Sequence, residues 1–420
     1  MEDQKRKRTP QHKPPSNIQK GIGLLIIAVS LVAGVYLMDR FQGVQVAWKP
    51  GEGKPSGLIQ KDKDLHLEFI KDWMYPTGTK VGSYELGGIS ALAFVPESQQ
   101  ILALSDDRGR NGPPRFFIFE WKTQGQLDLV PKKAVPLKEK GGMNFSKRVV
   151  DPEGIASLGN EQFLWSSEGE LELPPFHGPR WIRANFNGDF LGEIPIPKVF
   201  WDETKINFGI RPNLSFEALT VDPSKRWVYA MTESSLQQDG DVSDFENGTQ
   251  LRIVELDHQG DSFDQTGEFV YDLSRIPTGN EPVAGLEVAT IGASEILALG
   301  QRMFLIIERA YLARRDRNLV RLFFADCLQA TDVQCMETLK GMKYTKCEKR
   351  EILKFEDVED KLRSGVTRVQ NIEGMTWWRD LQLGKDYLLF VSDNNFNDKL
   401  VTQFLLFEMH GWKDPFANGK

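Results

Sequence analysis

The sequence predicts an all-β fold: a β-propeller of four-stranded antiparallel blades behind a single N-terminal transmembrane helix. Three observations lead to this prediction. From about residue 64 onward, short apolar runs alternate with turns rich in Gly, Pro, Asn and Asp, and helical periodicity is scarce. One hairpin pattern recurs five times in this region. Near the front of the chain, a long apolar stretch contains no charged residue.

The N-terminal segment has the features of a membrane anchor. Residues 1–20 form a basic tail, and residues 21–38 are 18 uncharged residues, about the minimum for a helix that spans a bilayer. Because the positive charges precede this stretch, we expect a cytoplasmic tail and an exported remainder, periplasmic or extracellular. A cleaved signal peptide is one alternative, although no small-x-small cleavage site follows, and a buried helix of a soluble protein is the other. Residues 39–63, with several glycines, are expected to form a stalk.

The exported part of the chain is acidic. The tail carries a net charge of +4 and the whole chain −7, so residues 39–420 carry −11. Such a domain argues against nucleic acid as a partner. The basic tail is explained more simply as a topology signal or as a contact with anionic lipid.

The recurring hairpin consists of an apolar strand that opens with an acid or a glycine, a turn, and a second apolar strand that ends in an acid. The five pairs are 87–94 with 101–107, 152–156 with 163–168, 216–221 with 227–233, 294–299 with 304–309, and 371–376 with 388–397. A third strand follows each pair, at 115–120, 180–185, 251–256, 320–325 and 404–408, and a weaker fourth strand usually comes next. Four antiparallel strands per unit, at a period of roughly 65–80 residues, are typical of propeller blades. Five blades can be recognised in the sequence, and the longer third and fourth units leave room for a sixth.

Strands near 64–86 are expected to complete the last blade and to close the ring within a domain of residues 64–412. A β-sandwich is the structural alternative, but it would not explain why the acid-ended hairpin repeats. One short helix is expected near 356–363.

If all hairpins have the same orientation, their acidic ends meet at one mouth of the central channel. In an antiparallel pair the start of the first strand lies beside the end of the second, as Glu373 and Asp393 would in the last hairpin. The acids expected at the mouth are Asp106, Asp107, Glu153, Glu168, Glu217, Glu233, Glu295, Glu308, Glu373 and Asp393.

A cluster of this kind needs compensating charge. Two carboxylates about 5 Å apart repel by roughly 3 kcal/mol at an effective dielectric constant near 20, so protons, arginines or a hard cation must be present. Arg108, Arg211 and Arg309 are the expected arginines. Ca²⁺ is the expected cation, because it accepts irregular sets of oxygen ligands, whereas five histidines without a cluster make zinc a poor candidate. The alternative is that the acids only hydrogen-bond turns and neighbouring blades.

Other sequence signals narrow the chemistry. The chain has no Gly-x-Ser-x-Gly elbow and no glycine-rich phosphate loop, so any hydrolysis would use metal-activated water with a carboxylate as base. Three cysteines, Cys327, Cys335 and Cys347, form no Cys-x-x-Cys motif. In an oxidising compartment one disulfide could close a loop and leave one free thiol, and the sequence does not determine the pair.

Several of these motifs together resemble a known family. The segments 88–90 with 105–107, 151–155, 211–219, 307–309, and 371–375 with 391–396 resemble, in this order, the family described as esterase-like activity of phytase. The resemblance covers about residues 80–410. It implies a β-propeller in an exported protein with ester or phosphoester hydrolase activity, similar in spirit to calcium-dependent propeller phytases, which have six blades and acid-bound calcium. This chain departs from the pattern by its membrane anchor and by the cysteine-bearing segment 327–347.

Two main hypotheses follow. The first is an anchored hydrolase of small anionic esters, phosphate esters or related ones, in which the residues have three roles. Glu153, Glu217 or Glu373 would act as base; Arg108, Arg211, Arg309, Asn394 and Asn395 would bind substrate; and Asp106, Asp107, Glu168, Glu233, Glu308 and Asp393 would hold Ca²⁺. The second is a non-catalytic propeller that binds a ligand or a protein, with structural Ca²⁺. A lactonase-like propeller lies between them. Whether basic residues reach the acidic mouth distinguishes the two main hypotheses.

Overall fold

The computed structural model describes residues 65–122, 127–278 and 288–412. These ranges belong to the larger of two compact units, Lys61–Lys420. The expected tail, transmembrane helix and stalk, residues 1–63, lie outside the described residues, so the anchor stays a prediction. Within the described ranges, no helix has the length and apolar character needed to cross a bilayer.

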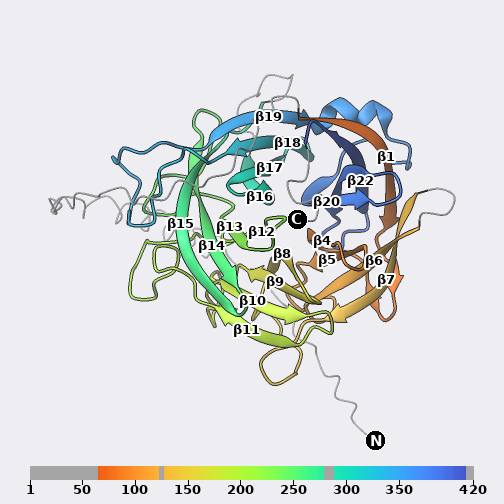
Figure 1. Ribbon diagram of the computed structural model, residues 1–420, viewed down its shortest axis with the longest axis horizontal. Coiled ribbons are helices and arrows are strands. Elements are labelled where there is room, and N and C mark those ends of the chain that lie inside the picture. Colours follow the sequence, from red (N-terminus) through yellow and green to blue (C-terminus); the bar gives the residue numbers. More distant parts are fainter. Residues whose placement is uncertain (1–64, 123–126, 279–287, 413–420) are drawn as a thin grey trace, which may run out of the picture. The chain divides into compact units, whose positions relative to one another are not determined.

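Five four-stranded antiparallel sheets are arranged as blades around a common axis (Figure 1). Blade 1 consists of β4 (Ile89–Val95), β5 (Gln100–Ser105), β6 (Arg115–Lys122) and β7 (Asp128–Pro136). Blade 2 consists of β8 (Pro152–Gly159), β9 (Gln162–Ser167), β10 (Arg180–Asn185) and β11 (Phe190–Ile194). Blade 3 consists of β12 (Ala218–Val221), β13 (Trp227–Met231), β14 (Thr249–Gln259) and β15 (Ser262–Leu273).

Blade 4 consists of β16 (Ala289–Gly300), β17 (Met303–Leu312), β18 (Arg317–Asp326) and β19 (Glu348–Lys354). Blade 5 consists of β20 (Asn371–Asp380), β21 (Lys385–Asp393), β22 (Val401–His410) and β1 (His66–Pro76). A two-stranded ribbon of β2 (Lys80–Val81) and β3 (Tyr84–Glu85) and a 3₁₀ helix, η1 (Phe355–Lys361), complete the described elements. The all-β propeller prediction is confirmed with five blades, and a sixth is absent from the described part of the chain.

The ring is closed by a strand from the start of the propeller. β1 pairs antiparallel with β22, from His66 opposite His410 to Pro76 opposite Val401. The expected completion of the last blade by the segment near 64–86 is therefore confirmed. Because this ladder joins the two ends of the domain, the ring cannot open without breaking its hydrogen bonds.

The innermost strands are buried on both faces. Every residue of β4 and of β8 is buried, because a neighbouring blade packs against each face. Each of the five largest hydrophobic clusters combines side chains from two adjacent blades. Phe116 of blade 1, for example, packs edge-on against Phe163 of blade 2, with ring centroids 4.8 Å apart. Packing between blades therefore stabilises the ring, and it holds the inner strands close to the axis.

The cysteine-bearing segment lies along the outer strand of blade 3. A disulfide joins Cys327 to Cys347, which answers the pairing that the sequence left open, and Cys335 is free and exposed. The backbone N–H of Val333 donates to the Glu268 carbonyl at 2.8 Å, and that of Cys347 donates to the Val270 carbonyl at 2.9 Å. This segment of blade 4 thus covers the edge of β15 and clamps two blades together.

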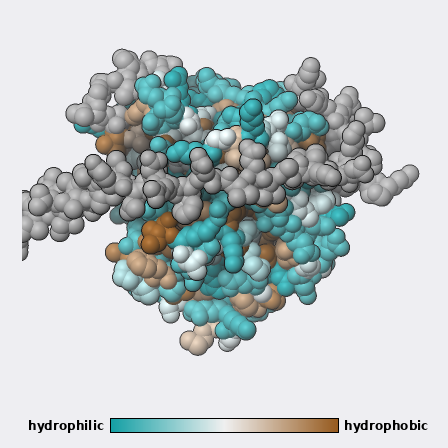
Figure 2. Space-filling model, turned by 90° about the vertical axis from the view of Figure 1, so that its left-hand side faces the viewer, coloured by the Kyte–Doolittle hydropathy of each residue, from teal (hydrophilic) through white to brown (hydrophobic). Residues whose placement is uncertain are grey.

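The surface on the β15 side is mainly hydrophilic (Figure 2). On the described residues seen there, hydrophobic side chains lie in small separate patches, which is ordinary for a protein surface.

Candidate functional site

The five hairpins at the centre of the blades share one orientation. At one end of the axis the innermost strand of each blade begins and the second strand ends. In each blade, the second strand places one side chain at this mouth. These five side chains occupy equivalent positions in the strand pairings of their blades. We call these the ring positions: Asp106, Glu168, Glu233, Arg309 and Asp393, which lie opposite Gly88, Asp151, Ser215, Gly292 and Asn371.

The innermost strands deliver a second set of side chains through backbone irregularities. The ladder register shifts at Ser90, Glu153, Ser294 and Glu373, and Glu217 immediately precedes β12. A β-bulge inserts an extra residue and re-aims its side chain. The three glutamates proposed as bases, Glu153, Glu217 and Glu373, therefore occupy one equivalent position in blades 2, 3 and 5, and serine takes it in blades 1 and 4.

The ring positions and the three glutamates, but not the two serines, line a cavity of about 1140 Å³ at the mouth. The carboxyl groups that interact with one another in or beside it are Asp106, Asp151, Glu153, Glu168, Glu217, Glu233, Glu373 and Asp393. We refer to these eight residues as the mouth acids. The sequence prediction that acidic hairpin ends converge thus agrees with the structure for seven of the eight. The eighth, Asp151, is not among the acids predicted from the sequence, although its position directly before β8 and two residues before Glu153 is a usable signal.

Burial controls the protonation of this cluster. It raises the pKa of Glu233 and of Asp151 to about 7, although Arg309 and Arg108 respectively act in the opposite direction. The pKa values of the other mouth acids are raised as well, first by burial and, for most of them, next by neighbouring carboxylates; these are Asp106, Glu153, Glu168, Glu217, Glu373 and Asp393. The cluster therefore has a strong tendency to take up protons or a cation.

Two arginines reach the mouth acids. Arg309 donates from Nη1 to Oδ1 of Asn371 at 2.9 Å, and its Nη2 lies 3.3 Å from Glu373 and 3.8 Å from Glu233. Arg108 forms an ion pair with Asp151 and donates to Oδ1 of Asn213 at 2.7 Å. Two of the three arginines expected at the mouth are therefore there.

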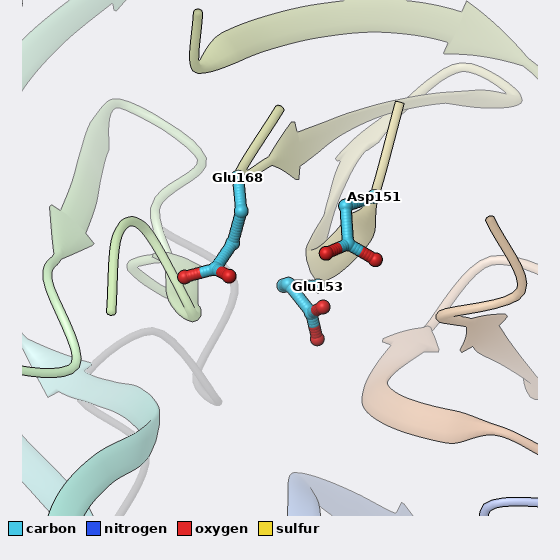
Figure 3. Close-up of side chains that lie close together, drawn as sticks. All are labelled: Asp151, Glu153 and Glu168. Atoms are coloured by element: carbon cyan, nitrogen blue, oxygen red, sulfur yellow. The ribbon is translucent and has the colours of Figure 1, made fainter. Parts of the chain in front are cut away.

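Three of the acids form a compact group that could hold a metal ion. One ligand atom each from Asp151, Glu153 and Glu168 lies within 4.8 Å of the others, and all three side chains are buried. In Figure 3, Glu168 and Asp151 lie on opposite sides, and Glu153 lies below them. Oδ1 of Asp151 has no hydrogen-bond partner among the described residues. Oxygen-only ligands in an irregular arrangement fit Ca²⁺.

Two residues expected at the mouth have their polar groups engaged elsewhere. Asp107 lines the cavity, but its carboxylate forms a fully buried ion pair with Arg115 at 2.8 Å. Asn394 accepts from the N–H of Gly88 at 3.0 Å and donates to Thr77 at 2.8 Å, so it holds the turn that carries its neighbour Asn395 into the cavity lining. Asp107 and Asn394 therefore shape the wall, and Asn395 is the residue of the three that can face a ligand.

Arg211 and Glu308 were expected at the mouth, and this expectation is wrong for both. Neither residue lines the cavity. Arg211 donates to the carbonyls of Ser235 at 3.0 Å and Gly240 at 2.5 Å, so it braces the loop after β13. Glu308 accepts from the Tyr271 hydroxyl at 2.7 Å and pairs with Lys349. Successive side chains on a strand point to opposite faces, so Arg309 at the next position, and not Glu308, points to the mouth.

Glu295 was also expected at the mouth, and it lies deeper. It follows the bulge of β16 at a position where the other blades have small residues, namely Ala91, Gly154, Ala218 and Gly374. Its carboxylate accepts from the Ile296 N–H at 3.0 Å. Burial raises the pKa of Glu295, and the backbone N–H groups of Ile296, Met375 and Leu219 act against this. The carboxyl group therefore faces the innermost strands of three blades.

The fold and the mouth define a class: a five-bladed β-propeller with a cavity at one end of its axis, lined by buried acids and a few arginines. The family model named Phytase-like, described as esterase-like activity of phytase, matches residues 84–396, and the chain belongs to this family. The resemblance inferred from the sequence is thereby confirmed. Membership suggests a possible hydrolase. No curated protein matches the chain in sequence.

Proposed function

We propose that the chain is a hydrolase of small anionic esters, phosphate esters or related ones, which works with Ca²⁺ at the mouth of the propeller. Family membership supports a hydrolase. The observation that carries the proposal is the group of eight buried carboxyl groups at the mouth, of which Arg108 and Arg309 contact only some, while the other basic residues of the cavity lining, all within the described ranges, pair with none of them. Acids in such excess require protons or a divalent cation.

The residues present fit Ca²⁺. Asp151, Glu153 and Glu168 would hold it, because they are close together, buried and rich in oxygen ligands. When bound, the cation would supply positive charge that attracts an anionic ester and makes a nearby water more acidic.

Arg309 and Glu217 are the protein groups best suited to the substrate and to the proton. Arg309 lines the cavity with a side chain that is 20% exposed, so its guanidinium can bind an anionic group. Glu217 lines the same cavity, has a raised pKa, and has neither a hydrogen bond from its side chain nor an ion pair among the described residues. A carboxyl group that has no hydrogen-bond partner and a raised pKa is a stronger base than an ordinary carboxylate, so it is suited to accept a proton from water. Asn395 on the wall would help to orient the ester.

Ester turnover with and without the cation tests this proposal. We would follow release of p-nitrophenol from its phosphate and its acetate, in Ca²⁺ and in chelator, using the full-length chain in detergent. We expect phosphate turnover that needs Ca²⁺ and falls at least about 100-fold in Glu217→Gln, the usual contribution of a general base. Glu203→Gln, which changes an exposed acid outside the cavity, is the matched control. Acetate turnover alone would favour an esterase or a lactonase.

A non-catalytic propeller with structural Ca²⁺ is the second candidate. It is favoured by the hydrogen bond that Glu168 of blade 2 accepts from the Ser215 N–H, because this bond ties the mouth acid to the segment that leads into blade 3. The same turnover experiment separates the two. If neither ester is hydrolysed while Ca²⁺ raises the melting temperature, the cation is structural and the mouth is a binding site.

The proposal includes a membrane anchor at residues 21–38, with the propeller on the periplasmic or extracellular side. The disulfide between Cys327 and Cys347 supports an oxidising compartment. Extraction of membranes with carbonate should leave the chain in the pellet, and protease added outside intact cells or spheroplasts should reach the propeller. Release by carbonate would argue against the anchor.

A further inference from the structure

One of the five ring positions carries a charge opposite to that of the other four. Four of them are acidic, Asp106, Glu168, Glu233 and Asp393, and in blade 4 the equivalent residue is Arg309. Equivalence rests on the ladders: Arg309 pairs with Gly292, two residues before the bulge at Ser294, as Asp393 pairs with Asn371, two residues before the bulge at Glu373. The guanidinium therefore enters the mouth where a fifth acid would enter in a fully repeated ring.

Arg309 is held by acids of both neighbouring blades. Its Nη2 lies 3.8 Å from Glu233 of blade 3 and 3.3 Å from Glu373 of blade 5. It also lowers the pKa values of Glu217 and Asp393, and the charges of these acids raise its own pKa. One guanidinium thus partly compensates the acids of blades 3 and 5.

The backbone opposite Arg309 makes room for this contact. A Cβ atom at Gly292 would lie 2.2 Å from Oε1 and 2.3 Å from Cγ of Glu233, which no side chain could tolerate without moving the glutamate. Because residue 292 has no side chain, Glu233 can lie across blade 4 toward Arg309. This packing observation is independent of the charges.

The acids on the other side of the mouth are grouped differently. Asp151, Glu153 and Glu168 come together within 4.8 Å, and the arginine beside them, Arg108, is paired with Asp151. Arg309 is not among the main influences on the pKa of Glu153 or Glu168. The mouth therefore has two halves: in one, Arg309 lies between acids of blades 3 and 5, and in the other, three clustered acids, one of them paired with Arg108, are the place for a metal ion.

We propose that Arg309 acts as a built-in cation that occupies a second metal position of the ring, so that the mouth binds a single divalent cation, at Asp151, Glu153 and Glu168. This inference rests on the proposed function for the identity of that one cation. It adds that the number of bound ions is set by residue 309. An acid there would complete five acidic ring positions and leave Glu233, Glu373 and Asp393 without their arginine, which creates an oxygen-rich site for a second Ca²⁺.

Counting bound Ca²⁺ tests the inference without any assay of activity. We would titrate the full-length chain in detergent with Ca²⁺ by calorimetry and count ions by native mass spectrometry. About one ion per chain is expected for the wild type and for Arg309→Lys, and about two for Arg309→Asp. Glu168→Gln should weaken the wild-type ion at least about tenfold.

Arg309→Asp also has a stability readout. Ligands that bind only the folded state raise its stability in proportion to the number of sites. The melting temperature of Arg309→Asp should therefore rise more steeply with the logarithm of Ca²⁺ concentration than that of the wild type, including when the variant folds only with Ca²⁺ present. An equal or smaller slope would overturn the inference.

The outcomes separate this inference from the proposed function. If Arg309→Asp binds the same number of ions as the wild type, or if the wild type already binds two, the role of Arg309 is wrong, and Ca²⁺-dependent turnover in the wild type would still stand. If the wild type binds none and Arg309→Asp binds one, the role of Arg309 stands and the cation at Asp151, Glu153 and Glu168 is wrong.

Discussion

Glu233 and Asp151 lie in the mouth with pKa values raised to about 7, because burial disfavours the charged form of a carboxyl group. Each value exceeds that of the unfolded chain, near 4.5 for Glu and 3.8 for Asp. Between these limits the folded state binds more protons than the unfolded state. The stability that comes from the protonated form is therefore present at low pH and is lost as pH rises through about 7.

Because stability falls as pH rises, the first prediction concerns the melting temperature at different pH values. In chelator, the melting temperature should fall by about 5 °C or more between pH 5 and pH 8, since the mouth acids must ionise without compensation. Ca²⁺ should reduce the fall, and Glu233→Gln should remove part of it. Differential scanning calorimetry in matched buffers measures this. A melting temperature that rises through the window in chelator would contradict it.

Glu295 leads to a second prediction at the same scale. Its carboxyl group faces the backbone N–H groups of Leu219, Ile296 and Met375 in the buried centre of the ring. Glu295→Ala would leave these donors without an acceptor, and each buried unsatisfied group costs about 1–3 kcal/mol. We expect the free energy of unfolding, measured by denaturant titration, to fall by about 2–4 kcal/mol. Glu203→Ala on the surface should change it by less than about 0.5 kcal/mol, and an equal effect of both variants would refute the role of Glu295.

At the scale of elements, the close approach of the innermost strands decides what each hairpin can carry. The position after the bulge is small in four blades, and in blade 2 it is Gly154 of β8. A Cβ atom there would lie 2.7 Å from Cβ of Leu219 and 2.9 Å from the Glu217 carbonyl oxygen. Because residue 154 has no side chain, β8 can approach both β12 and the Glu217 backbone closely.

Gly154→Ala should therefore separate two blades. We expect a loss of about 1–3 kcal/mol in the free energy of unfolding, the usual cost of overpacking. Gly240→Ala is the matched control, because a Cβ atom there has nothing within 4 Å. Equal stability of Gly154→Ala and the wild type would show that the inner strands are more adaptable than the packing implies.

At the scale of the whole molecule, closure by β1 makes the domain a single ring. Its side chains pack into the last blade: Trp73 stacks on Phe404 of β22, with ring centroids 5.5 Å apart, and meets Trp121 of blade 1 edge-on at 6.2 Å. Blade 5 therefore depends on a strand that lies more than 300 residues away along the chain.

Removal of β1 should abolish cooperative folding. A chain that lacks residues 1–79 leaves β22 as an uncovered edge strand, and such edges promote aggregation. We expect it to be insoluble or to melt without a sharp transition, whereas a chain that lacks only residues 1–60 should melt cooperatively. Circular dichroism melting curves compare the two, and similar curves would show that closure is dispensable.

The sequence determined the repeated part of this protein. Apolar runs and turn residues repeat with the blades, so the five hairpins, the third strands and the closing strand could be predicted, and so could most of the mouth acids, because each acid lies at a strand end. These features are local, because an antiparallel hairpin brings residues that are close in the sequence next to one another in space.

Only the tertiary structure decided the rest. A shift of one residue along a strand moves a side chain to the other face, so Glu308 pairs with Lys349 while Arg309 faces the acids. Arg211 lies in a loop whose path directs its side chain toward backbone carbonyl groups. The segment that lies along blade 3 brings Cys347 next to Cys327, so these two cysteines form the disulfide. Whether the mouth gathers its acids into a cation site depends on packing between blades, where residues far apart in the sequence meet, and no local pattern records those distances.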